Sequence, residues 1–74
     1  MNFTAKNNYP EEIERVELLK HLAEKYKIPE FTHDVIVEKG VIPHSDPVLT
    51  MNTRKQSDLC LLQTLVHEQF HTQS

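Results

Sequence analysis

The chain has 74 residues, of which 38% are hydrophobic and 26% are charged, so it allows one small domain and is not polar enough to stay disordered. Its formal net charge is −3 and its 8 Lys and Arg residues are scattered, which argues against nucleic-acid binding, since that needs clustered basic side chains. The single cysteine, Cys60, excludes an intrachain disulfide.

Residues 10–27 have the pattern of an amphipathic helix. Acidic residues in the first turn and basic residues in the last match the helix dipole, and Pro29 is expected to end the helix. The apolar residues recur at spacings of three and four, which is the helical period. They are Ile13, Val16, Leu19, Leu22, Ala23 and Tyr26.

Two strands separated by a loop are predicted next. The β-branched run Val35–Val37 indicates the first strand, and Glu38-Lys39-Gly40 offers a turn or a bulge after it. The segment IPHSDP places two prolines around a short polar run and is therefore expected to be a loop. The segment PVLTMNTR, from Pro47 to Arg54, predicts the second strand.

The last predicted element is a helix. It is expected to begin at Thr53, because Thr53 and Gln56 fit a capping box, with Ser57 as the competing cap. On a helical wheel with ~100° per residue, the apolar residues of this segment occupy an arc roughly 180° wide, and the other side is a polar stripe. The arc holds Leu59, Leu61, Leu62, Leu65, Val66 and Phe70. The polar stripe holds Cys60, Gln63, Thr64, His67, Glu68 and His71.

The order of elements predicts an α+β fold. An N-terminal amphipathic helix and a C-terminal helix are expected to pack with a small two- to three-stranded sheet. Residues 1–74 are expected to form a single small domain.

Within the last helix, His67-Glu68-Gln69-Phe70-His71 places two histidines one turn apart, with a glutamate after the first. Both imidazoles can then converge on one zinc ion, while the glutamate can reach a metal-bound water without coordinating the metal. Zinc lowers the pKa of such a water to ~7, and the carboxylate can accept its proton. Chance alone predicts roughly 0.03 such motifs in a chain of this composition, so we interpret the motif as a metal site.

The stretch Thr64–Thr72, TLVHEQFHT, resembles the extended signature of the zincin-like (HExxH) zinc metallopeptidases. By this resemblance His67 and His71 would ligate Zn²⁺, and Glu68 would be the general base in peptide-bond hydrolysis. The order of elements is also similar to the N-terminal portion of a zincin catalytic domain, in which a backing helix and a twisted sheet precede the active-site helix. In that family the strand before this helix often lines the substrate cleft, so PVLTMNTR would be its counterpart.

Catalytic zinc normally has three protein ligands, and zincins generally take the third from a later helix or loop. Gln73 stands where the family signature usually has a hydrophobic residue, and Ser74 stands where its metzincin branch would have a glycine. We therefore expect the chain to be a fragment of a larger zincin-like domain, inactive as 74 residues alone. His33, His44 and Asp46, or a second chain, are the alternative sources of the third ligand.

The expected partner of such an enzyme is a peptide or protein substrate. The alternative is a non-catalytic protein-interaction module, or a self-associating fragment without a bound metal. The start MNFTAKNNYP lacks the apolar run of a secretory signal, and no stretch approaches the ~20 apolar residues that cross a bilayer. We therefore expect a cytoplasmic protein without membrane contact. Cys60 is expected to be a small buried residue, and His21 to pair with Glu17 in solvent.

Overall fold

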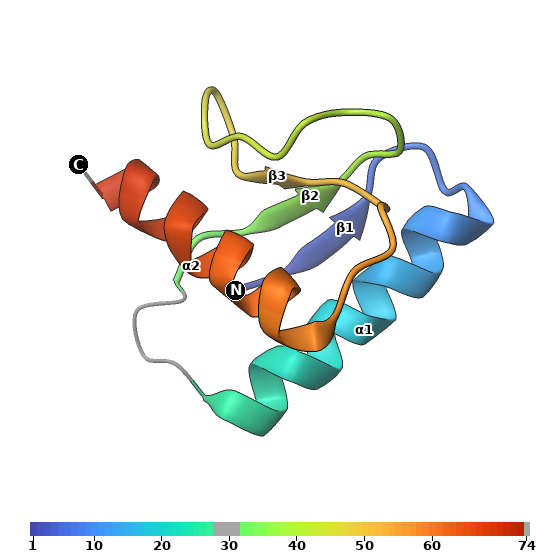
Figure 1. Ribbon diagram of the computed structural model, residues 1–74. Helices are drawn as coiled ribbons and strands as arrows, with labels where there is room; N and C mark the ends of the chain where they lie inside the picture. Colours follow the sequence, from blue (N-terminus) through green and yellow to red (C-terminus); the bar gives the residue numbers. More distant parts are fainter. Residues whose placement is uncertain (28–31, 74) are drawn as a thin grey trace.

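The computed structural model describes residues 1–27 and 32–73 (Figure 1). The α+β class predicted from the sequence is confirmed, and the sheet has three strands in these residues. No helix in this part of the chain is both long and apolar enough to cross a membrane. The elements in chain order are β1 (Phe3–Ala5), α1 (Pro10–Tyr26), β2 (Val35–Val37), β3 (Thr50–Met51) and α2 (Asp58–Gln73).

The sheet is parallel throughout, in the order β1-β2-β3. Its first strand, β1, is missing from the sequence prediction, which has no strand before the first helix. Three residues are too few to show the alternating pattern of a strand, and β1 is defined by pairing with β2, where Phe3 lies beside Val35 and Ala5 beside Val37. The partner lies more than 30 residues away, so the local sequence does not reveal it.

The second predicted strand is much shorter in the structure than in the sequence prediction, Thr50–Met51 against Pro47–Arg54. Beyond Met51 the backbone leaves the sheet, because its carbonyl groups take a different partner. The buried guanidinium group of Arg15 donates to the carbonyl oxygens of Asn52 and Thr53, both at 3.4 Å, and of Arg54 at 2.8 Å. Arg15 thus links α1 to the segment that leads into α2.

The first helix has the predicted bounds to within one residue, Pro10–Tyr26. Lys27 follows it in the left-handed region at φ 45°, and its N–H donates to the Ala23 carbonyl at 3.0 Å, which ends the helix. Pro29, the expected stop, lies outside the described residues. The buried stripe is narrower than predicted, because Ile13 and Tyr26 are 47% and 43% exposed.

A buried carboxylate fixes the beginning of α1. Glu12 accepts hydrogen bonds from the backbone N–H of Asn7 at 2.8 Å, of Tyr9 at 3.3 Å and of Lys39 at 2.9 Å. Burial is the largest influence and raises the pKa of Glu12, but the hydrogen bonds from Lys39, Asn7 and Tyr9 together outweigh it, so the pKa lies below its ordinary value. Glu12 therefore joins the helix to the turn after β2.

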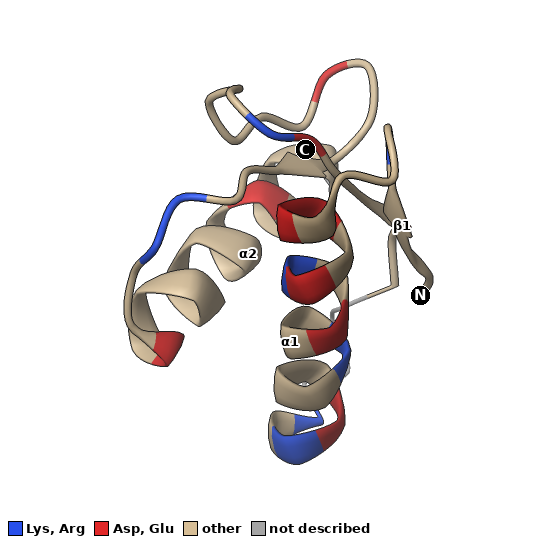
Figure 2. Cartoon of the chain, turned by 90° about the vertical axis from the view of Figure 1, so that its right-hand side faces the viewer, with Lys and Arg blue, Asp and Glu red and all other residues tan. Residues whose placement is uncertain are grey.

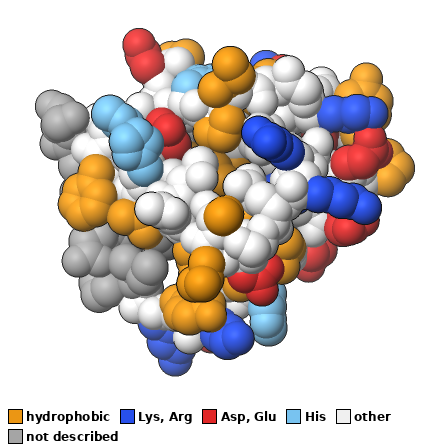
Figure 3. All heavy atoms as spheres, in the orientation of Figure 1, with side chains coloured by type: hydrophobic (Ala, Val, Ile, Leu, Met, Phe, Trp, Pro, Cys, Tyr) orange, Lys and Arg blue, Asp and Glu red, His pale blue; other side chains and the backbone are white. Residues whose placement is uncertain are grey.

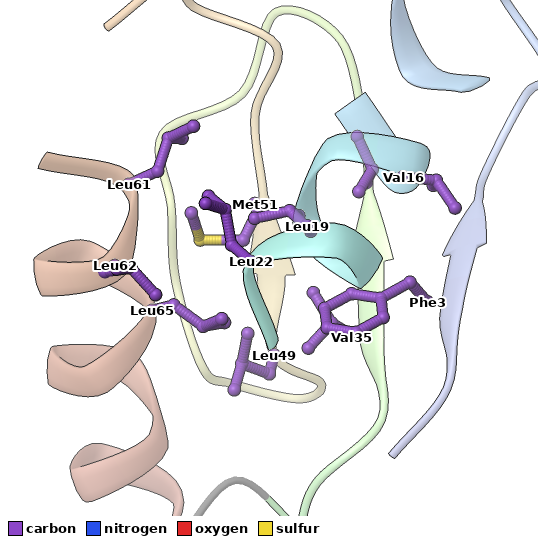
Figure 4. Close-up of a cluster of buried hydrophobic side chains, with 11 residues drawn as sticks. Phe3, Val16, Leu19, Leu22, Val35, Leu49, Met51, Leu61, Leu62 and Leu65 are labelled. Carbon is purple, nitrogen blue, oxygen red and sulfur yellow. The ribbon is translucent and has the colours of Figure 1, made fainter. Parts of the chain in front are cut away.

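Both helices pack on the same face of the sheet, and the hydrophobic core lies between the helices and the sheet (Figures 1 and 4). In Figure 4 the leucines of α2 point toward α1 and the sheet. Because paired residues of a parallel sheet share a face, the register aligns the core side chains of all three strands. The core consists of Phe3, Val16, Leu19, Leu22, Val35, Val37, Leu49, Met51, Leu61, Leu62 and Leu65.

Candidate functional site

The helix that carries the histidine motif begins at Asp58, and the hydrogen bonds of Ser57 make that residue its cap. The Ser57 hydroxyl accepts from the Cys60 N–H at 3.2 Å, and the Ser57 carbonyl accepts from the Leu61 N–H at 3.0 Å. The predicted start at Thr53 is wrong, and the competing cap is the real one. Thr53 lies outside the helix, and its carbonyl accepts a hydrogen bond from Arg15.

The two histidines of the motif converge at the surface of α2. The Nε2 atoms of His67 and His71 are 2.9 Å apart, and their rings meet edge to face with centroids 4.4 Å apart. Both side chains are exposed. Figure 3 shows pale blue histidine side chains at the surface over the C-terminal part of α2. The sequence prediction that both histidines project together from one side of the helix is confirmed.

This spacing fits two ligands of one zinc ion. At a Zn–N distance of ~2.05 Å, two tetrahedral ligand nitrogens are about 3.3 Å apart, so the rings of His67 and His71 need to open by only about 0.4 Å. In their present contact the Nε2–H of one ring donates a hydrogen bond to the Nε2 of the other. To hold a metal, the donating ring would carry its proton on Nδ1 instead, so that both imidazoles are neutral and coordinate through Nε2.

Glu68 does not lie on the side of α2 that the sequence predicts. The sequence places it on the polar stripe beside the histidines, but the residue is only 8% exposed and lies on the buried side of α2. No hydrogen bond or ion pair of its carboxylate is found among the described residues. The carboxylate is adjacent in sequence to His67, and its oxygens are not fully buried although most of the residue is. Both properties are compatible with a proton-accepting role.

The predicted apolar arc of α2 is wrong at one of its edges, where Leu59 and Phe70 lie about 20° apart on the helical wheel. Leu59 is 72% exposed and Phe70 is 58% exposed, whereas the polar Gln69 is only 1% exposed. The helix is therefore turned so that Glu68 and Gln69 face inward. A helical wheel ranks residues by hydropathy alone and cannot detect a polar side chain that has a distant hydrogen-bond partner.

Gln69 is the residue of the motif that the sequence analysis overlooked. Its Oε1 accepts from the backbone N–H of His33 at 3.4 Å, and its Nε2 donates to the His33 carbonyl at 3.4 Å. The Nδ1 atom of His33 lies 3.2 Å from Gln69 Oε1 and 3.2 Å from the hydroxyl of Thr72. These contacts hold the last turns of α2 against the chain before β2, and so fix the orientation of the histidine pair.

The upstream candidates for a third ligand do not join the pair. His33 is bound to Gln69 and Thr72, on a different side of α2. His44 is held by the Ile42 carbonyl, 2.8 Å from its Nδ1, and Asp46 is exposed in the following loop. Among residues 1–27 and 32–73 no group of three His, Cys, Asp or Glu side chains is close enough to hold a metal ion.

The predicted solvent pair of His21 and Glu17 is not present, although both residues are exposed on α1. The Glu17 carboxylate instead lies 3.8 Å from the ammonium group of Lys20. This ion pair joins two side chains three residues apart on the surface of the helix.

Cys60 is exposed, so its predicted burial is wrong. The buried face of α2 begins with Leu61 instead. A shallow groove of about 390 Å³ runs along this outer side of the helix and reaches His67. It is lined by Gln56, Cys60, Gln63, Thr64 and His67.

The strand expected to line a substrate cleft has its outer edge occupied. The N–H of Thr50 donates to the His44 carbonyl at 2.7 Å, and the Thr50 carbonyl accepts from the His44 N–H at 3.0 Å. An extended peptide cannot pair with β3 at Thr50 while the loop holds this position.

Comparison of the chain with models of protein families, with curated proteins and with solved structures found no match. The function proposed below therefore rests on the geometry of α2.

Proposed function

We propose that the chain carries the two-histidine, one-glutamate part of a zincin-like zinc metallopeptidase site that hydrolyses peptide bonds. The observation that supports this proposal is the convergence of His67 and His71, whose Nε2 atoms are 2.9 Å apart on one exposed helix face. The buried residues Leu65 and Gln69 anchor the opposite face of α2, so the pair is held in position before any ion binds.

In this proposal the Nε2 atoms of His67 and His71 hold the metal, and zinc when bound supplies a Lewis acid that activates water. Glu68 accepts the proton of that water at a carboxylate oxygen and later delivers it to the leaving amine. The outer groove beside His67 is a hollow in which a substrate backbone can lie.

A complete catalytic site needs one more protein ligand, because catalytic zinc normally has three. The described residues supply two. We therefore propose that the third ligand comes from outside these residues, and that the 74-residue chain by itself hydrolyses peptides poorly or not at all.

Zinc binding is the first test. Metal-free protein is titrated with zinc in a calorimeter, and the wild type is compared with His67→Ala and with His21→Ala, which removes an exposed histidine from α1. We expect His67→Ala to weaken zinc binding at least tenfold and His21→Ala to leave it unchanged. Equal binding by all three proteins would remove His67 as a ligand.

The second test concerns Glu68. A Glu68→Gln variant should bind zinc as the wild type does and should lose any hydrolysis of a fluorogenic peptide mixture. Hydrolysis that survives this substitution would eliminate Glu68 as the base. If zinc binds through the histidines but no variant hydrolyses peptide, even with imidazole or acetate added as a third ligand, the peptidase proposal fails.

The second candidate function is a non-catalytic interaction module. It is favoured by the large exposed apolar side chains on α2, Leu59 and Phe70, because a helix face of this kind is typical of a surface that binds another protein. Stable folding together with an absence of zinc binding at neutral pH would favour this candidate over the peptidase.

A further inference from the structure

The exposed face of α2 carries almost no charge. Between Leu59 and His71 the only charged residue is Glu68, and it is buried. Figure 2 shows the contrast: α1 is marked with acidic and basic residues along its length, whereas α2 is mostly uncharged. A solvated helix face normally carries charges, while the centres of protein–protein interfaces are depleted in them.

Apolar side chains accompany the histidine pair on this neutral face. Phe70, between the two histidines in sequence, is 58% exposed, and Leu59 near the start of the helix is 72% exposed. Figure 3 shows orange hydrophobic side chains beside the pale blue histidines. A partner that covered the histidine pair would therefore also remove apolar surface from water.

The number of zinc ligands that α2 supplies points to a second copy of the chain as the partner. A tetrahedral zinc ion takes four donors, and His67 and His71 supply two. A second copy of the chain presents the same two nitrogens, and a twofold axis through the ion brings the four together. We propose that two copies of this chain share one zinc ion through His67 and His71 of each, with the neutral faces of their α2 helices in contact.

This inference rests on the zinc-binding pair of the proposed function and adds a form of regulation. Four histidine nitrogens leave no coordination position for water, so the shared site is closed to hydrolysis. The neutral surfaces favour this pairing because no like charges meet when two identical faces approach each other. A third ligand from elsewhere and a second copy of the chain would compete for the same pair.

The shared zinc ion is tested by measuring the mass of the protein in solution as zinc is added. Metal-free chain, kept reduced, is analysed by sedimentation velocity over a series of zinc ratios. We expect the mass to double as the ratio reaches one zinc per two chains. A large excess of zinc should return the mass toward that of one chain, because each histidine pair then takes its own ion. A chelator should also reverse the doubling.

Variants separate the histidine pair from other zinc-binding groups. His67→Ala and His71→Ala should each abolish the doubling, whereas His21→Ala should retain it. Cys60→Ser should also retain it, since Cys60 is exposed on the same helix and a thiolate could otherwise bridge two chains. Phe70→Ser should weaken the dimer, by at least threefold in its dissociation constant. Circular dichroism should show the same helix content in every variant.

The possible outcomes are distinct. A single-chain mass at every ratio, with one zinc bound per chain, would overturn the shared ion while leaving the proposed peptidase site intact. A zinc-dependent dimer without hydrolysis under any condition would support the shared ion and remove the peptidase. A dimer that forms equally well without zinc, or in His67→Ala, would overturn the inference.

Discussion

Individual polar residues in the interior determine how the elements of this protein meet. Glu12 and Gln69 are 0% and 1% exposed, and each bonds backbone groups from a segment more than 25 residues away. A side chain that serves a distant backbone group costs little to bury, because its polar atoms remain paired. Loss of such a side chain leaves the backbone groups unpaired, which is the costly event.

The Glu12→Gln variant should reveal the charge of the buried carboxylate. Glu12 has a lowered pKa when folded, so its stabilising effect is present above the ordinary value of 4.5 and is lost as the pH falls through the lower folded value. We expect Glu12→Gln to lower the melting temperature at pH 7, and the difference from wild type to shrink as the pH is lowered toward 3. Thermal unfolding at several pH values measures this.

The matched control for that experiment is Glu24→Gln, which removes one exposed carboxylate from the same helix. It should change the melting temperature far less at pH 7. A difference between Glu12→Gln and wild type that stayed constant from pH 7 to pH 3 would contradict the role given to the ionised carboxylate.

At the scale of elements, a helix or strand can be predicted from the sequence when the interactions that form it are between residues close in the chain. The helix from Pro10 and the strand Val35–Val37 are predicted well, since their causes are a local period and a run of β-branched residues. The strand β1 and the orientation of α2 are not, because they arise from pairing with distant residues. For the same reason the convergence of His67 and His71 is predictable from a spacing of four, while the burial of Glu68 is not.

The beginning of α2 supplies a prediction that compares two candidate caps. Ser57→Ala should lower the free energy of unfolding by about 1 kcal/mol, because the hydroxyl that accepts from the Cys60 N–H is removed. Thr53→Ala should change it by less than about 0.5 kcal/mol, since only the backbone carbonyl of Thr53 is used. Urea unfolding measures both, and a larger effect from Thr53→Ala would contradict the observed start of the helix.

Over the whole molecule, Arg15 joins the first half of the chain to the second. Its guanidinium group lies on α1 and is 7% exposed, with hydrogen bonds to three successive carbonyl groups before α2. The planar fork of an arginine can serve several acceptors at once, whereas a lysine offers a single ammonium centre. The packing of α2 against α1 therefore depends on the shape of this side chain as well as its charge.

Arg15→Lys should accordingly destabilise the fold by about 1–3 kcal/mol, the usual range for losing hydrogen bonds to a buried charged group. Arg54→Lys makes the same chemical change at an exposed position and is the matched control. Urea unfolding followed by circular dichroism compares the two. Equal stability of both variants would show that charge alone suffices at position 15.

The contact between His44 and Thr50 also determines where the sheet can grow. The loop occupies the backbone of β3 at Thr50, whereas no strand lies beyond β1 in the described part of the chain. A strand from another molecule can therefore extend the sheet only past β1. That open edge is three residues long and is followed by the exposed Lys6, two properties that disfavour edge-to-edge aggregation.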